Sequence, residues 1–344
     1  MDTMTHGILG AAVAHAASGG RLGRKAMLVG VAAGMLPDAD TFIRSAADPF
    51  LRMEYHRQFT HALVFVPIGA ALALLPFLLS GWGRRHWRSL YLAALLAYLS
   101  HPLLDLTTSY GTLLLWPFSR ARLAVDWISV VDPLFSVPIL VLVICAAVTN
   151  RRRLATAAIC FGLCYLTLGA VQEARARNLQ AEIAAGRGDR IARGRVMPTM
   201  GNLVVWRSVY IAGGTIHADA LRLALPGGRS YVPGETAALV ERPPLDGTVP
   251  PGVQEKLQRE FRRLWWFSDG YVARSVQDPA ILGDMRYSLR PEAFEPLWGV
   301  RVQPADASRP AAWVRIPVQG RRDGLGELWT LVEGTSPKLR SKQL

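Results

Sequence analysis

The chain has 344 residues, of which 51% are hydrophobic, and its formal net charge is +13. Long apolar runs fall almost entirely before Val171, and much of the basic charge lies in short loops between them. This distribution favours a membrane domain followed by a soluble one. It argues against a nucleic-acid-binding protein, because no helix-turn-helix, zinc-finger or stacking-strand signature accompanies the charge. The three cysteines lie in apolar segments, so they predict no disulfide framework and are expected to be buried: Cys145, Cys160 and Cys164.

The N-terminal region predicts a tight helical hairpin. One apolar segment covers 5–17, with Thr3 or Thr5 as its helix cap, and a second covers 26–36. Each is shorter than the ~20 residues that a membrane span needs, so we expect neighbouring helices to bury part of the hairpin. The first segment lacks a preceding basic region and is not predicted to be a cleavable signal peptide.

Residues that can bind metals stand at the ends of these segments. The proline that ends the second segment should place Asp38 and Asp40 on an irregular turn. Further on, His56 lies in a polar loop, and Thr60 is expected to cap the next helix with His61 in its first turn. A helix N-terminus disfavours a protonated imidazole, which would keep His61 neutral and able to bind a metal.

Four longer apolar segments are predicted to span the membrane, at 62–80, 89–106, 131–148 and 154–171. The second span carries His101 and Asp105, which are four residues apart. On a helix this spacing places both side chains on one face, about 5–6 Å apart at Cβ. An imidazole and a carboxylate so placed can share a metal ion.

The basic loops predict the orientation of the spans. Loops 21–25, 84–88 and 151–153 should be cytoplasmic by the positive-inside rule. Alternation then places seven potential ligands at the opposite, extracytoplasmic end: His6, Asp38, Asp40, His56, His61, His101 and Asp105. The charge rule makes no reference to these residues, so their convergence is independent support for a shared site. The last span runs outward, so the region that follows it should also be extracytoplasmic and should roof the site.

The second half of the chain predicts a small α+β domain. We expect a membrane domain over 1–171 and an extracytoplasmic domain over 172–344, joined by a helix at about 172–186. Within the second domain, the patterns predict an amphipathic helix at 253–267, a disordered tail at 336–344, and strands at 202–211, 216–225, 298–302, 312–318 and 327–332. The predicted fold is therefore mainly α: a polytopic helical membrane bundle, with an N-terminal hairpin plus about four spans, and a C-terminal α+β soluble domain.

The seven His and Asp residues predict a metal centre. Mixed imidazole and carboxylate ligands suit zinc, and also manganese or iron. Seven ligands exceed the needs of one tetrahedral ion, so we expect two ions. Beside His56, Arg57 is either a clamp for a phosphate oxygen or an interfacial arginine that reaches to water.

Other polar residues have more ordinary interpretations. Asp126 and Asp132 could hold a ligand imidazole by a hydrogen bond, although the proline after Asp132 makes a helix cap equally reasonable there. The remaining histidines fall outside the cluster and are expected to be structural: His15, His86 and His217.

Four motifs, in this order, resemble the YdjM-type family of bacterial inner-membrane metal-dependent hydrolases. They are Thr5-His-Gly7, Leu36-Pro-Asp-Ala-Asp40, His56-Arg-Gln-Phe-Thr-His61 and Tyr98-Leu-Ser-His-Pro-Leu-Leu-Asp105, followed by Tyr110-Gly111 and Leu115-Trp-Pro117. The resemblance covers roughly the first 135 residues and implies metal-ligand roles for the seven residues above. The His-x-x-x-Asp element is also similar to zinc-dependent phospholipase C. Many relatives place a histidine directly after the second aspartate, where this chain has Thr41, so that position or one metal could be dispensable here.

The C-terminal domain resembles the extension of longer family members, for which no role is implied. The similarity lies around Pro198-Thr-Met-Gly-Asn202, Trp206-Arg207 and Asp284-Met-Arg286.

Together these features predict a membrane-bound metal-dependent hydrolase of a phosphoester or phospholipid-like substrate. Asp38, Asp40 and Arg57 are the candidate catalytic residues, and membrane lipids and a lipid or small phosphoester substrate are the expected partners. The alternative is a non-catalytic metal-binding membrane protein for transport, sensing or envelope assembly. A transporter should carry ionisable residues through the bilayer midplane, and the cytoplasmic halves of the predicted spans have almost none. The oligomeric state is left open.

Overall fold

The computed structural model describes residues 1–18, 22–45, 47–48, 50–243, 251–301, 312–315 and 321–341. The chain forms two compact units. The first, the helical unit, comprises Met1–Ile43, Tyr55–Val171 and Met200–Asn202. The second, the α+β unit, comprises Arg44–Glu54, Gln172–Thr199 and Leu203–Leu344.

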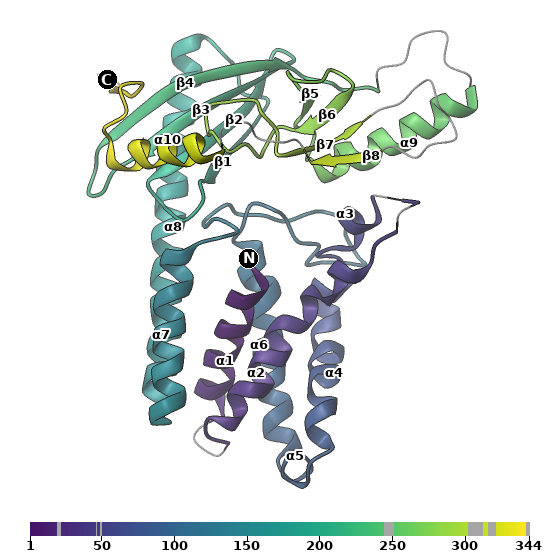
Figure 1. Ribbon diagram of the computed structural model, residues 1–344, viewed down its shortest axis with the longest axis vertical. Helices are drawn as coiled ribbons and strands as arrows, with labels where there is room; N and C mark the ends of the chain where they lie inside the picture. The colour runs from purple at the N-terminus through teal and green to yellow at the C-terminus, as the bar shows by residue number, and fades with distance from the viewer. Residues whose placement is uncertain are drawn as a thin grey trace. The chain divides into compact units, whose positions relative to one another are not determined.

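The helical unit is built around helix α6 (Trp87–Leu106). Helices α1 (Thr3–Ala17) and α2 (Lys25–Met35) form an antiparallel hairpin that packs on α6, and α4 (Val66–Leu78) packs on α6 as well (Figure 1). Small residues let the hairpin close tightly: a Cβ atom added to Gly10 would lie 2.3 Å from the Gly30 carbonyl oxygen. Close backbone approach through glycine is a common way for membrane helices to associate.

Two expected helix starts are wrong. The cap of α1 is Asp2, whose carboxylate accepts the backbone N–H of Thr5 at 3.0 Å, and not Thr3 or Thr5. Thr60 does not cap α4 and His61 is not in its first turn, because both lie in a short 3-10 helix, η2 (Phe59–His61). An extended Ala62 then separates η2 from η3 (Leu63–Phe65) and α4.

The expected four spans are not confirmed. By length and composition, two helices could cross a membrane: α6 and α8 (Arg152–Arg187). The helical segments Leu51–His61 and Leu63–Leu78 meet at a bend of 58°, and they give a third span if they are counted as one broken helix. Within 62–80, the break at Ala62 leaves α4 with 13 residues, and α7 (Pro133–Thr149) has 17. Both are short of the ~20 residues of an upright span.

The cysteines also differ from expectation, because all three are free and exposed on helices α7 and α8 and not buried: Cys145, Cys160 and Cys164. They lie on apolar helix surfaces of the kind that lipid covers in a membrane.

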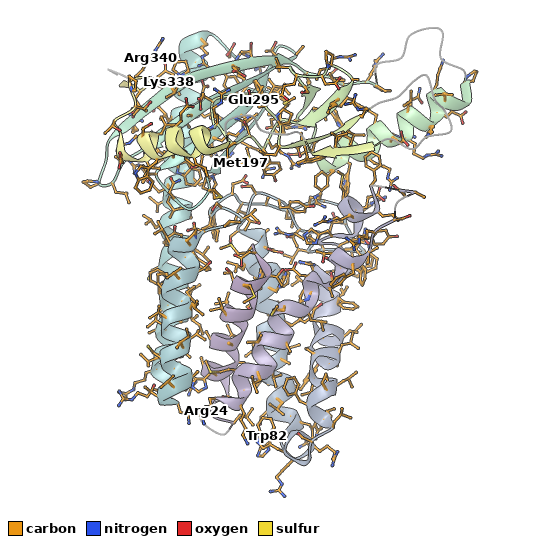
Figure 2. The ribbon with its side chains drawn as sticks, in the orientation of Figure 1. Arg24, Trp82, Met197, Glu295, Lys338 and Arg340 are labelled. Atoms are coloured by element: carbon orange, nitrogen blue, oxygen red, sulfur yellow. The ribbon has the colours of Figure 1, made fainter. Side chains whose placement is uncertain are left out.

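The basic loops meet at one end of the helical unit. Arg24 and Trp82, the latter in helix α5 (Gly81–Arg85), are labelled at this end in Figure 2. The ammonium of Lys25 lies 5.3 Å from the centre of the Trp82 ring. A Cβ atom on Gly23 would lie 3.4 Å from the side-chain oxygen of Asn150, in the turn between α7 and α8. The turns that follow α1, α4 and α7 are therefore neighbours.

The α+β unit holds two antiparallel sheets. One has the order β1-β2-β3-β4-β9, and the other has the order β5-β6-β7-β8. Their bounds are β1 (Arg193–Pro198), β2 (Val205–Ala212), β3 (Thr215–Leu223), β4 (Arg229–Ala238), β5 (Val272–Arg274), β6 (Ile281–Asp284), β7 (Trp298–Arg301), β8 (Ala312–Arg315) and β9 (Arg340–Ser341). The helices are α3 (Leu51–Tyr55), whose last residue belongs to the helical unit, α9 (Pro251–Phe267) and α10 (Arg321–Glu333).

Most of the predicted elements of this unit are confirmed. Strands β2 and β3 stand where alternation predicted them, joined at two glycines with positive φ, Gly213 and Gly214. The amphipathic pattern at 253–267 is helix α9, which buries Leu257, Phe261 and Leu264. Residues 302 and 316–318 of two predicted strands lie outside the described residues.

Two predictions for the C-terminal end are wrong. Residues 327–332 are part of helix α10 and not a strand, and Leu328 and Leu331 are buried at a helical spacing of three residues. The tail is not disordered at Arg340–Ser341, because strand β9 pairs there with β4.

Two arginines of the motifs singled out in the second half of the sequence have a packing role in this unit. Arg207 is 4% exposed, and its guanidinium donates to the backbone carbonyls of Met285, Pro291 and Ala293 at 2.6–2.9 Å. Burial lowers the pKa of Arg207 to about 10, which leaves it charged at neutral pH. Arg286 forms a buried ion pair with Asp284 at 2.6 Å. Arg207 thus holds the segment 285–293 against β2, and Arg286 ties the same segment to the end of α9 through the Phe267 carbonyl at 2.7 Å.

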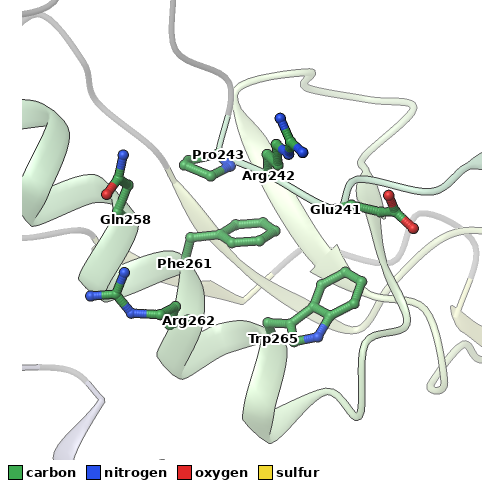
Figure 3. Close-up of a pocket in the computed structure, with 7 residues that line it drawn as sticks. All are labelled: Glu241, Arg242, Pro243, Gln258, Phe261, Arg262 and Trp265. Carbon is green, nitrogen blue, oxygen red and sulfur yellow. The ribbon is translucent and has the colours of Figure 1, made fainter.

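Helix α9 also borders a hollow on the surface of the α+β unit (Figure 3). Its lining residues are Glu241, Arg242, Pro243, Gln258, Phe261, Arg262 and Trp265. The lining mixes two rings with charges of both signs.

Candidate metal centre

The seven predicted ligands come together in the helical unit. Helix α1 contributes His6, and the 3-10 helix η1 (Leu36–Phe42) contributes Asp38 and Asp40. The segment that ends in η2 contributes His56 and His61, and α6 contributes His101 and Asp105. Asp38, His61, His101 and Asp105 offer ligand atoms that all lie within 4.8 Å of one another. Asp38, Asp40 and His56 form a second such group, which shares Asp38. The structure therefore contains a possible site for metal ions.

The orientation of two imidazoles follows from their hydrogen bonds. Nδ1 of His101 lies 2.6 Å from the Gly34 carbonyl oxygen, which can only accept, so this nitrogen carries the proton. Nδ1 of His61 lies 2.9 Å from the hydroxyl of Thr60, and that hydroxyl donates its own proton to Asp40. His61 Nδ1 is therefore also the donor. In both rings the Nε2 atom is left with a lone pair, the form that binds a metal.

These lone pairs converge on a carboxylate oxygen. The Nε2 atoms of His61 and His101 lie 3.0 Å apart, and Oδ2 of Asp105 is 3.2 Å from the first and 3.4 Å from the second. No hydrogen bond reaches Asp105 Oδ2 from any residue that the structure describes. Three buried acceptor atoms without a proton between them repel one another, and buried polar groups without partners are costly. A divalent cation bound at this point would satisfy all three.

His6 contacts this group from α1. Its Nε2 lies 3.0 Å from Asp105 Oδ1, and its ring stacks on that of His101 with 3.5 Å between ring centres. Its other ring nitrogen, Nδ1, is buried and makes no hydrogen bond within the described part of the chain. His6 lies beside the first ligand group without being a member of either group.

Asp40 organises the segment that carries His56 and His61. Its carboxylate accepts from His56 Nδ1 at 2.7 Å, from the Arg57 backbone N–H at 2.9 Å and from the Thr60 hydroxyl at 2.7 Å. Burial alone would raise the pKa of Asp40, but hydrogen bonds from His56 and His61 outweigh it and hold this pKa well below its ordinary value. Burial lowers the pKa of His56 more than its contact with Asp40 raises it. The result is an ionised carboxylate beside a neutral imidazole.

Arg57 is buried and does not extend to water. It is 2% exposed, and its guanidinium donates to the Thr108 hydroxyl at 2.9 Å and pairs with Asp105 Oδ1 at 3.0 Å. Its φ of 64° lies in the left-handed region, which is uncommon for a residue with a side chain. The hydrogen bond from its backbone N–H to Asp40 holds this conformation.

Other residues singled out in the sequence lie outside the ligand groups. Asp132 caps α7, accepting the Phe135 N–H at 3.2 Å, and its carboxylate also accepts the Tyr165 hydroxyl at 3.0 Å. The hydroxyl of Thr41 donates to the backbone carbonyl of Asp38. Asp126 is buried with a φ of 58°. The three remaining histidines contact residues elsewhere: His15 at Gly23, His86 at Trp82 and His217 at Tyr210.

Several residues of the centre have roles that the sequence did not predict. Tyr98 donates to the Thr60 carbonyl oxygen at 2.8 Å and so ties η2 to α6. Thr60 and Thr108 hold His61 and Arg57, and the carbonyl of Gly34 sets the tautomer of His101. Backbone carbonyls and hydroxyls of this kind become recognisable only when the partner is in place.

Comparison with known proteins assigns the N-terminal half of the chain to a family. The sequence model of the YdjM inner membrane protein family matches residues 1–176 of the chain. The chain belongs to the YdjM inner membrane protein family. Inner membrane protein YbcI of Escherichia coli (strain K12) is similar to it, with 33% identity over 103 residues. These residues are 29% of this chain and 58% of that relative, less than two thirds of its length. No solved structure matches the chain.

The YdjM match covers all seven predicted ligands, which lie between His6 and Asp105. Together with the apolar helices α6 and α8, it makes this chain a membrane protein of the YdjM family with a possible metal site.

Proposed function

We propose that this protein is a membrane-bound metal-dependent hydrolase that acts on a phosphoester or phospholipid-like substrate at the extracytoplasmic face of the inner membrane. The observation that carries the proposal is the convergence of His61 Nε2, His101 Nε2 and Asp105 Oδ2 within 3.0–3.4 Å, buried and without a shared proton. Imidazole and carboxylate donors suit zinc, with manganese or iron as alternatives. Asp38 belongs to both ligand groups, which supports two ions.

The two aspartates of η1 have different roles in this proposal. A bound divalent ion would polarise a phosphoryl oxygen and lower the pKa of a water molecule toward ~7. Asp40 is fully engaged with its four neighbours and serves to orient His56 and His61. Asp38 is 7% exposed and accepts a hydrogen bond from the Thr3 hydroxyl at 2.5 Å. Asp38 is therefore the better candidate to bridge two ions or to accept a proton.

Arg57 stabilises the negative charge of the centre in this scheme. Because its guanidinium pairs with Asp105, it offsets part of the charge of a metal ligand. A contact between Arg57 and a phosphate oxygen would require the arginine to share its donors with Asp105 and Thr108.

The hydrolase proposal is tested by an activity screen on metal-loaded protein purified in detergent. We expect turnover of at least one phosphomonoester, phosphodiester or phospholipid, its removal by a chelator, and its recovery on adding Zn²⁺ or Mn²⁺. Asp38→Asn should lower the rate at least ~100-fold, the size expected for loss of general acid–base help. Bound metal with no turnover on any ester class would favour a non-catalytic metal-binding protein.

The orientation is tested with a reporter fused after Leu344. The basic loops meet at one end of the helical unit, which supports a cytoplasmic position for that end and an extracytoplasmic position for the proposed metal centre. We expect alkaline phosphatase in this fusion to be active and a fluorescent protein that matures only in the cytoplasm to be dark. The reverse result would overturn the assigned side.

A further inference from the structure

The most exposed residue of the metal centre is His56. The side chain of His56 is 16% exposed and that of Asp38 is 7% exposed, whereas His6, His61, His101 and Asp105 are at most 1% exposed. A substrate therefore reaches the centre most readily near His56. The ring that faces His56 here is Tyr110, with 5.3 Å between ring centres in an edge-on arrangement.

Two guanidinium groups flank the ring of Tyr110. The central carbon of Arg57 lies 4.8 Å from the centre of this ring, and that of Arg122 lies 5.0 Å from it. Of the two arginines, Arg57 is buried on the metal ligand Asp105, whereas Arg122 is partly exposed. Arg122 is thus a positive charge beside the ring that faces His56.

The backbone holds Arg122 in this place. Thr112 and Leu123 exchange two backbone hydrogen bonds of 2.9 Å, and this antiparallel pair fixes the backbone directly after Arg122. The guanidinium donates to the carbonyls of Tyr110 at 3.2 Å and Gly111 at 3.0 Å. Gly111 has a φ of 87°, and a Cβ atom there would lie 3.2 Å from Cβ of Arg122. A preorganised arginine loses less entropy on binding an anion than a free surface side chain does.

We propose that Arg122 is a specificity-determining residue that binds the phosphate group of the substrate at the His56 side of the metal centre, with Tyr110 as its platform. This inference rests on the proposed function and names the substrate group that the centre receives. A guanidinium suits this role because its five N–H donors form a planar fork that matches phosphate oxygens. Nη2 of Arg122 shares its donors with the Tyr110 and Gly111 carbonyls in this arrangement. The phosphate can belong to a membrane lipid or to a soluble ester, since both present the same oxygens.

The test measures binding and not turnover. Inorganic phosphate and dihexanoyl phosphatidic acid are titrated separately, by calorimetry, into zinc-loaded protein in detergent. We expect Arg122→Gln to weaken binding of both probes by about 10- to 100-fold, the size expected for loss of a charge-assisted hydrogen-bonded pair. Arg122→Lys keeps the charge but loses the planar fork of donors, so its affinity for each probe should lie between those of the wild type and Arg122→Gln. Tighter binding of the lipid than of inorganic phosphate would identify the lipid as the source.

Arg120→Gln is the matched control, because Arg120 is exposed and lies two residues from Arg122 in the same loop. It should bind both probes as the wild type does, and all variants should keep the wild-type zinc content and melting temperature. The inference is overturned if Arg122→Gln binds as tightly as the wild type, if Arg120→Gln loses as much, or if zinc-loaded wild type binds neither probe. Wild-type protein that holds no metal would instead overturn the proposed function, and this inference with it.

Discussion

His101→Ala should remove most of the bound divalent metal from the purified protein. Residues that only orient a metal ligand typically contribute 10- to 100-fold to affinity, so loss of a ligand should weaken binding by at least ~100-fold. His101 is the position where the effect should be largest. Its Nε2 lies within 3.0–3.6 Å of His61, Asp105 and Asp38, and its Nδ1 is anchored on the Gly34 carbonyl.

The measurement is metal content by mass spectrometry, followed by competition with a chelator of known affinity. His15→Ala is the matched control, since His15 is also a buried histidine of the helical unit but hydrogen-bonds to the Gly23 carbonyl. The control should keep the wild-type metal content. Full occupancy in His101→Ala would exclude this imidazole as a ligand. Absence of metal from the wild type would remove the basis of the proposed function.

Gly34→Ala should destabilise the helical unit by about 3 kcal/mol and also weaken metal binding, because there is no room for a methyl group between α1 and α2. The added Cβ atom would lie 2.4 Å from the carbonyl oxygen of His6 and 3.3 Å from Cα of Gly10. The two helices would have to separate. Their separation would displace His6 and the Gly34 carbonyl that binds His101.

Thermal unfolding in detergent, with and without added Zn²⁺, measures both effects. Gly81→Ala in α5 is the control, because nothing lies within 4 Å of a Cβ atom added there. The control should have the melting temperature of the wild type. Gly34→Ala should have a lower melting temperature, and added Zn²⁺ should raise it less than it raises that of the wild type. Equal melting of Gly34→Ala and the wild type would show that α1 and α2 are not packed this closely.

Close packing of α1 against α2 and the orientation of His101 both depend on the same residue, Gly34. The hairpin closes through Gly10, Gly30 and Gly34, and the last of these also orients His101, a candidate metal ligand. Helix packing and ligand geometry are therefore coupled, and metal binding should in turn stabilise the contact between α1 and α2.

Local patterns of apolar residues were enough to predict many of the helices and strands. Apolar runs marked α1, α2 and α6 to within a few residues, because side-chain periodicity follows burial. Partial alternation was enough to predict β2 and β3, although every residue of β2 is buried. The prediction failed where a short segment fitted both the two-residue period of a strand and the period of a helix. Residues 327–332 alternate well enough for a strand but bury Leu328 and Leu331 as a helix.

The break before α4 shows a different limit. Apolar composition is continuous through 62–80, so composition predicts one helix. The helix instead begins at Val66, because Ala62 is extended and the N–H of Leu63 bonds to the Leu114 carbonyl, 51 positions along the chain by their numbers. A tertiary hydrogen bond overrode local preference there.

The sequence by itself determined which residues form the candidate metal centre, because His and Asp at the ends of apolar segments are costly unless they have a function. The tertiary structure decided what each of them does. It showed that Asp40 orients two imidazoles, that Arg57 neutralises Asp105 and that Arg122 lies over Tyr110. The physical reason is that a lone pair acquires its direction from a hydrogen-bond partner. For His101 that partner is the Gly34 carbonyl, 67 residues away, which only the packing of α2 against α6 brings within reach.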